Sequence, residues 1–273
     1  MCLAAWAVAQ HPRYPWVLAS NRDELFSRPT APLAWWRPQG SHAEVLSGRD
    51  LSAGGTWLGL TRAGVLALVT NVREPGRFDP AAASRGELVL QALNHGPRDA
   101  AWLAGLAAVP RNGYNLIVAD LNNGDAAWAS NRSAPQARVL GAGLFGLSNA
   151  ALDTPWPKVT QLKQRLGAAV AAAHSSHHLA DAAFAALADR QCVADADLPA
   201  TGVPLQRERQ LSPAFIHMDG SDAGAGAGAY GTRCSTVVIV EQTGLRREVL
   251  VIERRYGENG TVSGETALAC GLA

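Results

Sequence analysis

Cys2 is the side chain whose type and position best suit covalent chemistry. A small residue at this position permits removal of Met1, after which Cys2 would carry both a thiol and a free α-amino group. The pKa of an α-amino group in peptides is about 7.7 to 8.0, so near neutral pH part of it is uncharged and can accept the thiol proton. The sequence therefore predicts an N-terminal nucleophile. The alternative is a small buried residue at the start of a strand.

A second candidate group is a run of four polar residues, Asn21, Arg22, Asp23 and Glu24. They directly follow the apolar run 16–20, and a hairpin between that run and residues 3–10 would bring them beside Cys2. A carboxylate there can hold the α-amine, and an arginine can lower the thiol pKa or bind a substrate carboxylate. We interpret the run as substrate-binding and positioning residues, and the alternative is an ordinary charged turn.

Two asparagines, Asn71 and Asn149, occupy equivalent places, because each ends an apolar run. An asparagine amide that reaches a cleft from a strand end can donate to a developing oxyanion. Arg233 opens an apolar run near the end of the chain and could neutralise an anion in the same cleft. Asparagine is also common in plain turns, and an isolated arginine is most often a surface residue.

The composition is that of a chain that can bury a large core. Of its 273 residues 48% are hydrophobic and the formal net charge is +1, which excludes overall disorder and gives no basic face for nucleic acid. The apolar runs are far shorter than the roughly 20 residues that a transmembrane helix needs. The N-terminal segment lacks the regions of a signal peptide, so we expect cytoplasmic residence, free thiols and a small-molecule substrate or cargo.

The three histidines in the segment HSSHH, residues 174–178, have metal-like spacing but no matching carboxylate. They lie in a polar link between two helical patterns, so we expect no metal site there.

Apolar runs and turn residues predict nine strands, at residues 3–10, 16–20, 56–60, 65–71, 114–120, 125–130, 143–148, 232–241 and 245–255. The first four form two hairpins and precede any helix. The Gly-rich segment 217–231 is expected to be a mobile loop.

Helical signals begin at Ser84, which forms a capping box with Glu87, and the helix is expected to end at Gly96. Pro97 is expected to open a second helix, and a helical block fills 156–189. Strands and helices in this order predict an α+β fold, a sandwich of two antiparallel sheets with helical layers, in a single domain spanning 1–273.

A series of motifs runs in order along nearly the whole chain: MCL, SNRDE, RPT, GRDLSAGGTWLG, TNVREP, SRGELV, YNLIVAD, SNR, GLSNAALDTPWPKV, YGTR and STVV. This series resembles the NRDE family, which includes the transport and Golgi organisation protein 2 of animals. The resemblance implies an N-terminal-nucleophile hydrolase fold, a four-layer αββα sandwich.

A more distant likeness, to the choloylglycine hydrolases and penicillin V acylases, implies roles for single residues. By this likeness Cys2 is the nucleophile, Asp23 the carboxylate near its amine, Asn71 and Asn149 the oxyanion and positioning amides, and Arg233 a late cation. In these amidases an arginine precedes the asparagine of the second strand, whereas here Arg22 follows Asn21. Arg22 therefore cannot be equated with the amidase arginine by simple alignment.

Two functions are compatible with this resemblance. The first is hydrolysis of linear amide C–N bonds through Cys2, with no cofactor required. The second is non-enzymatic binding and intracellular trafficking of haem or an acyl-lipid such as acyl-coenzyme A, with haem as cargo.

Overall fold

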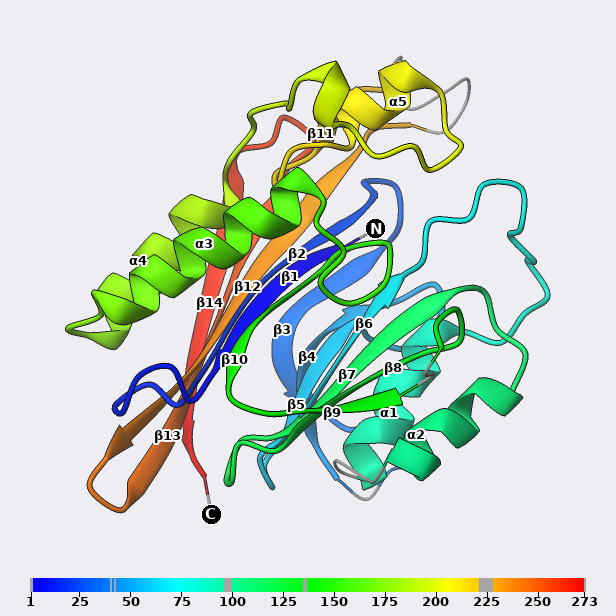
Figure 1. Ribbon diagram of the computed structural model, residues 1–273. Helices are drawn as coiled ribbons and strands as arrows, with labels where there is room; N and C mark the ends of the chain where they lie inside the picture. Colours follow the sequence, from blue (N-terminus) through cyan, green and yellow to red (C-terminus); the bar gives the residue numbers. More distant parts are fainter. Residues whose placement is uncertain are drawn as a thin grey trace.

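The computed structural model describes residues 2–39, 41, 43–95, 100–134, 137–220 and 228–272. Two antiparallel sheets lie face to face, and helices cover the outer face of each (Figure 1). One apolar cluster lies between the sheets, and two others lie between a sheet and its helices. The layers follow the order αββα that the resemblance implied, so the predicted fold class is confirmed.

The first sheet contains β10 (Gly143–Leu147), β1 (Cys2–Val8), β2 (Trp16–Leu25), β12 (Tyr230–Thr243), β13 (Arg246–Tyr256) and β14 (Val262–Gly271), in this spatial order, and the short β11 (His217–Met218) pairs with β12. The central strand β1 is apolar along its whole length, and β2 is apolar from Trp16 to Ala19, because both faces of the sheet are covered there. The prediction of a hairpin at the start of the chain is confirmed.

The second sheet contains β3 (Thr30–Trp36), β4 (Val45–Asp50), β5 (Leu58–Thr61), β6 (Val65–Asn71), β7 (Tyr114–Asp120), β8 (Ala126–Ser130) and β9 (Ala137–Leu140). All neighbouring strands in this sheet are also neighbours in the sequence, so it is a simple antiparallel meander.

The helices described are α1 (Arg85–His95), α2 (Ala100–Gly105), α3 (Pro157–Ala171), α4 (Ser176–Leu187) and α5 (Leu205–Gln210), with two short 3₁₀ turns at Leu106–Ala108 and Asp195–Asp197. α1 begins as predicted, and the Ser84 hydroxyl accepts a hydrogen bond from the backbone N–H of Gly86 at 3.2 Å. None of the described helices is both long and apolar enough to cross a membrane.

The side chains of β1 point alternately to the two faces of the sheet, which shows the face on which Cys2 lies. Ala4, Trp6 and Val8 belong to the cluster between the two sheets. Leu3 and Ala5 belong to the cluster under α3 and α4. Successive residues of a strand point to opposite faces, so Cys2 lies on the face between the sheets.

All nine predicted strands are present, but the structure also contains strands that the sequence did not predict. Six strands, not four, precede α1, because β3 and β4 were missed, and β9 and β14 were missed as well. β3 contains Pro32 and β14 is an edge strand with partly exposed residues along its length, so neither shows the apolar pattern of a central strand. The predicted helix start at Pro97 and residues 221–227 of the predicted loop lie outside the described residues. The ends of that loop, 217–231, belong instead to β11 and β12.

Candidate active site

The start of β1 lies against the polar end of β2. Cys2 is the cross-strand partner of Arg22, and Arg22 pairs on its other side with Cys234 of β12. The hairpin therefore brings the polar run beside Cys2, as the sequence predicted. The run lies within β2, which continues to Leu25, and not in a turn after it.

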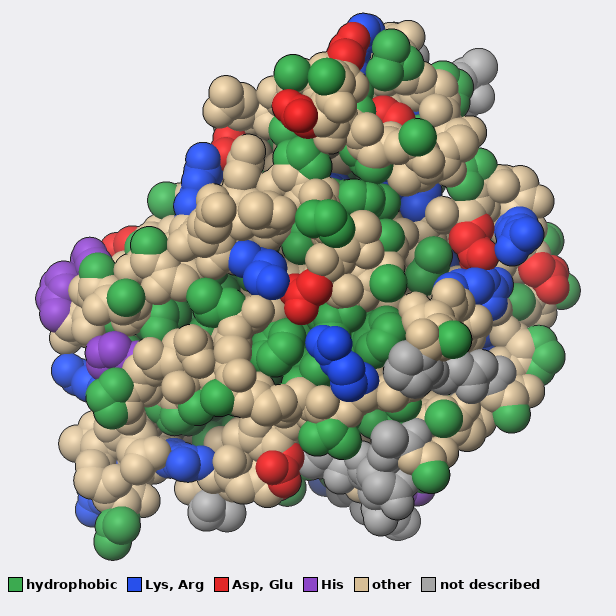
Figure 2. All heavy atoms as spheres, viewed as in Figure 1, with side chains coloured by type: hydrophobic (Ala, Val, Ile, Leu, Met, Phe, Trp, Pro, Cys, Tyr) green, Lys and Arg blue, Asp and Glu red, His purple; other side chains and the backbone are tan. Residues whose placement is uncertain are grey.

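A cleft of about 700 Å³ opens at this end of the sandwich. Its walls come from both sheets, from the loop after β6 and from the first turn of α1. Among the residues predicted for the site, those that line it are Cys2, Arg22, Asp23, Glu24 and Asn71. Figure 2 shows basic and acidic side chains gathered together on the part of this face that lies below α5. Acidic and basic side chains also line the cleft itself, among them Asp23 and Arg22, so the cleft is polar and carries both signs of charge.

The Cys2 thiol is buried, and burial raises its pKa. The negative charges of Asp23 and Glu24 raise the pKa further, while the Arg22 guanidinium lowers it. The thiol is therefore protonated near neutral pH. It needs a base close by before it can act as a nucleophile.

Asp23 is a buried carboxylate at the same end of β2. Its Oδ1 accepts a hydrogen bond from the Thr232 hydroxyl at 2.8 Å, and its backbone carbonyl accepts one from the Tyr230 hydroxyl at 3.3 Å. Burial raises the pKa of Asp23, and the nearby charges of Lys158 and Arg22 lower it, as does the hydrogen bond from Thr232. The register Cys2–Arg22 brings the beginning of β1 next to this carboxylate.

Lys158 does not line the cleft, but its charge acts on Asp23, and it was not among the residues predicted for the site. It lies in the first turn of α3, is buried, and donates from Nζ to the Leu211 carbonyl at 2.8 Å. Burial lowers its pKa to about 8, although the charge of Asp23 favours the protonated form. The sequence did contain a sign that Lys158 is buried, because it lies four residues before Leu162 and thus on the apolar face of the helix.

Lys158 gives the stability of the protein a specific dependence on pH. Its folded-state pKa of about 8 lies below the ordinary value of 10.5, so between these pH values the unfolded chain binds more protons. The contribution of Lys158 to the free energy of unfolding therefore increases as the pH rises through this window. Relative to a Lys158→Met variant, the wild type should gain on the order of 2 kcal/mol from about pH 7.5 to about pH 9.5.

Urea denaturation of both proteins at the two pH values measures this difference. A constant difference between wild type and Lys158→Met would contradict a buried ammonium at this position.

An ion pair closes the rear of the cleft and was also missed. Arg73 donates from one terminal nitrogen to Oε2 of Glu208 at 2.7 Å, and their side chains are only 6% and 4% exposed. The other carboxylate oxygen of Glu208 accepts hydrogen bonds from the backbone N–H and the hydroxyl of Thr201. The Arg73 guanidinium also stacks on Trp156 at 4.9 Å from the ring centroid. This wall is therefore fixed by several directional contacts.

The two asparagines meet, but only one faces the cleft. Asn149 is buried, and its amide donates to the backbone carbonyl of Asn71 at 2.8 Å. Its neighbour Ser148 donates to the carbonyl of Cys2 at 3.2 Å. Asn149 thus ties the ends of β6 and β10 together beside Cys2, while Asn71 lines the cleft.

Asn21 and Arg233 do not line the cleft. The Asn21 amide donates to the carbonyls of Leu187 and Ala214 at 2.9 and 2.8 Å, which fastens β2 to the last residue of α4 and to the segment after α5. Arg233 lies in a β-bulge, and its guanidinium donates to three backbone carbonyls of the turn after β2, those of Leu25, Phe26 and Arg28. In this structure both side chains support the strands that carry the site.

Glu24 connects two arginines at the cleft wall. Its Oε2 lies 3.9 Å from Arg22 and 4.0 Å from Arg28, and its Oε1 accepts a hydrogen bond from the N–H of Leu25. Arg28 has a closer partner, since it contacts Asp50 at 2.8 Å.

A close backbone contact holds α1 against the cleft. A Cβ atom on Gly55 would lie 2.9 Å from the backbone of Gly86 in the first turn of α1. Gly55→Ala is therefore expected to destabilise the protein by about 1–3 kcal/mol, as overpacking does. Gly141→Ala is the matched control, because a Cβ there meets nothing within 4 Å. Equal denaturation midpoints for the two variants would show that this contact is not tight.

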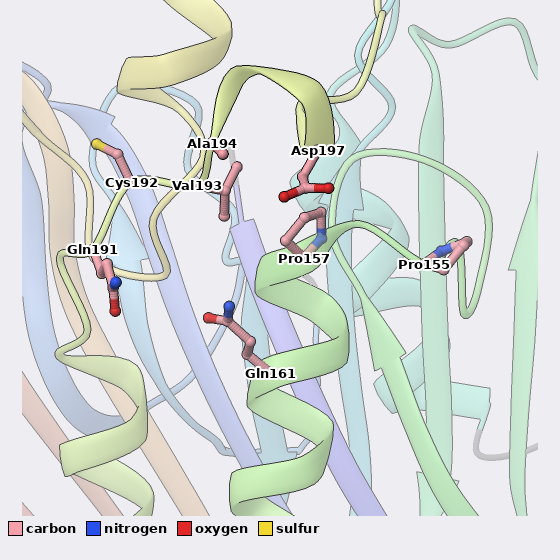
Figure 3. Close-up of a pocket in the computed structure, with 8 residues that line it drawn as sticks. All are labelled: Pro155, Pro157, Gln161, Gln191, Cys192, Val193, Ala194 and Asp197. Carbon is pink, nitrogen blue, oxygen red and sulfur yellow. The ribbon is translucent and has the colours of Figure 1, made fainter.

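A separate cavity of about 430 Å³ lies beside the start of α3 (Figure 3). It is lined by Pro155, Pro157, Gln161, Gln191, Cys192, Val193, Ala194 and Asp197. Cys192 and Asp197 are exposed, and none of the residues predicted for the site lies here. The predicted site residues that line a cavity therefore lie in the cleft at Cys2.

The sequence matches a family model described as Transport and Golgi organisation 2 over residues 1–258. A mouse Transport and Golgi organization 2 homolog is 34% identical over 261 residues, covering 93% of this chain and 91% of the mouse protein. The human homolog is 35% identical over 239 residues, covering 85% of this chain and 84% of the human protein.

Solved structures with a similar course of the chain share little sequence with it. A conjugated bile acid hydrolase from Clostridium perfringens is 10% identical with a TM-score of 0.47, over 98% of this chain and 92% of that chain. A Caenorhabditis elegans orthologue of N-acylethanolamine-hydrolyzing acid amidase is 11% identical with a TM-score of 0.42, over 87% and 92%.

Proposed function

The chain belongs to the Transport and Golgi organisation 2 family, and we propose that it hydrolyses linear amides with Cys2 as the nucleophile. The observation that carries this proposal is the pairing of Cys2 with Arg22 on the wall of the cleft, with the buried carboxylate of Asp23 next to it. A thiol, a carboxylate and a cation thus meet at the start of β1.

The proposed reaction begins after removal of Met1. The free α-amine of Cys2 takes the proton of the thiol, and the sulfur attacks the amide carbonyl carbon to form a C–S bond. The resulting ammonium gives its proton to the leaving nitrogen as the C–N bond breaks, which leaves a thioester on Cys2. Water then attacks the thioester, the amine accepts a proton from it, and the carboxylic acid leaves as the thiol is regenerated.

The neighbouring groups support this sequence of steps. Asp23 would hold and orient the α-amine, and the charge of Lys158 helps to keep Asp23 ionised. The side-chain amide of Asn71, at the edge of the cleft, is the candidate donor to the oxyanion. The raised pKa of the Cys2 thiol accounts for the need of a base at this site.

A fusion protein tests the requirement for a free α-amine. A protease site placed directly before Cys2 allows cleavage to expose Cys2 as the first residue. We expect fluorogenic acyl-amides to be hydrolysed only after cleavage, because a peptide nitrogen cannot act as the base. A fusion with Ala in place of Cys2 is the matched control. Equal turnover before and after cleavage would contradict the proposed mechanism.

A second candidate is a carrier of haem or an acyl-lipid that uses the same cleft without catalysis. The burial of the Cys2 thiol favours it, since a protonated thiol without an active base is not a nucleophile. Cys2 is also the one thiol among the residues that line the cleft in the described chain, and no histidine lines it. Titration with haemin would then produce a Soret shift in the wild type that Cys2→Ala lacks. Absence of any Soret shift would contradict the hypothesis that the chain carries haem.

A further inference from the structure

The arginines that line the cleft differ in their partners. Arg28 contacts Asp50 at 2.8 Å and Arg73 contacts Glu208 at 2.7 Å, so both charges are neutralised at close range. Two other arginines of the cleft wall, Arg22 and Arg85, have no such close carboxylate partner among the described residues.

Arg22 is buried, and few of its hydrogen-bond donors have a partner among the described residues. Its side chain is 5% exposed, and the nearest carboxylate in an ion pair within the described chain is Glu24, at 3.9 Å. Among the described residues its side chain donates one hydrogen bond, to the Thr30 hydroxyl at the long distance of 3.4 Å. The guanidinium stacks on Trp57, at 4.2 Å from the ring centroid, which fixes its plane. A guanidinium has five donors, so several remain for a ligand.

Arg85 lies across the cleft in the first turn of α1. It donates to the Gly113 carbonyl at 3.3 Å and makes no ion pair with any described residue. Ser84 and Gly86, at the start of the 11-residue α1, line the same wall. The partial positive charge of a helix N-terminus adds to that of the arginine. Burial lowers the pKa of the Arg85 guanidinium, while the charges of Cys2 and Glu24 raise it.

We propose that Arg22 and Arg85 bind an anionic group of the ligand, a carboxylate, sulfonate or phosphate, beside Cys2. Arg22 is the cross-strand neighbour of Cys2, so the anion would lie within a few bonds of the carbonyl that reaches the thiol. Trp57, Val69 and the 71% exposed Phe78 supply apolar surface on the same cleft for an acyl chain. This inference rests on the proposed function. Together they predict that the substrate is an amide between an apolar acyl group and an amine that carries the anionic group.

Binding to the Cys2→Ala variant tests the anion site without relying on catalysis. The probes are N-octanoylglycine, its neutral analogue N-octanoylglycinamide, and inorganic phosphate, each titrated by calorimetry. We expect the carboxylate to bind at least about tenfold more tightly than the amide, as for a charge-assisted contact. Phosphate should compete with the carboxylate only.

Substitutions assign the effect to the two arginines. Arg22→Gln and Arg85→Gln, each placed in the Cys2→Ala background, should lose the preference for the carboxylate and keep the affinity for the neutral analogue. Arg62→Gln, which breaks an exposed pair with Glu44 away from the cleft, is the control and should change neither affinity. Arg85→Lys should restore part of the preference if charge is what matters.

Three results overturn the proposal: equal affinity for the two analogues, equal losses for both in the Arg→Gln variants, or no binding of either at millimolar concentration. Hydrolysis of N-octanoylglycine by the wild type is measured separately. If the carboxylate probe binds selectively but the wild type shows no hydrolysis that depends on Cys2, the anion site is supported and the proposed amidase activity is refuted.

Discussion

The Cys2→Ala variant is expected to lose amide turnover by at least about 10³-fold, because the thioester cannot form without the thiol. Cys2→Ser should retain a small fraction of activity, since a hydroxyl is a weaker nucleophile at the same position. Folding should be little affected, because Ala is small and Cys2 lies at the end of β1. Initial rates with a fluorogenic acyl-amide, together with thermal unfolding of each variant, measure both effects.

Other cysteines provide the control for Cys2→Ala. Cys192 is exposed and lines the second cavity, so Cys192→Ala should keep the rate of the wild type. Cys234 is buried on the far side of Arg22, and its pKa is raised well above its ordinary value by burial, so it is not an alternative nucleophile. Turnover that survives in Cys2→Ala but falls in another cysteine variant contradicts the assignment of the nucleophile.

Breaking the ion pair at the rear of the cleft is expected to give the largest loss of stability. Glu208→Gln removes the carboxylate charge that pairs with the buried Arg73, and breaking a buried ion pair by removing one partner costs about 3–5 kcal/mol. The side chain of Arg73 also lines the cleft, so the same variant should weaken ligand binding. Denaturant unfolding measures the first effect, and calorimetry with the octanoylglycine probe measures the second.

Two further variants give this prediction its comparison. Glu44→Gln removes the partner of Arg62 in an exposed pair and should cost less than about 1 kcal/mol. The double variant Arg73→Met with Glu208→Leu should recover much of the stability lost by Glu208→Gln, because neither charge remains buried. A loss of stability in Glu208→Gln no larger than in Glu44→Gln would show that the buried pair contributes little.

The part of the site that the sequence could predict depends on short-range structure. Cys2 and Asp23 are joined by a single hairpin, so apolar runs and the two prolines between them were enough to bring thiol and carboxylate together. The strand ends that carry Asn71 and Asn149 were also recognisable from their apolar runs. The contact between these two asparagines was not, because it depends on how the sheets stack.

The rest of the site depends on contacts between distant segments. Arg73 and Glu208 are separated by 135 residues, and nothing local in the sequence marks them as partners. Arg233 was expected in the cleft because it opens a strand. It lies instead in a bulge of β12, and its guanidinium donates to backbone carbonyls of the turn after β2. Lys158 was overlooked because a lysine in a first helical turn is usually exposed. Here it is buried, and its ammonium donates to the carbonyl of Leu211, directly after α5.

The most direct test of the central claim is the mass of the N-terminal peptide after rapid acid quenching of a reaction with an acyl-amide. The proposed mechanism predicts a peptide that begins at Cys2 and carries the acyl group on its thiol. Treatment with hydroxylamine should remove that group, as expected for a thioester. Turnover by a protein that retains Met1, or acylation at any residue other than Cys2, would contradict it.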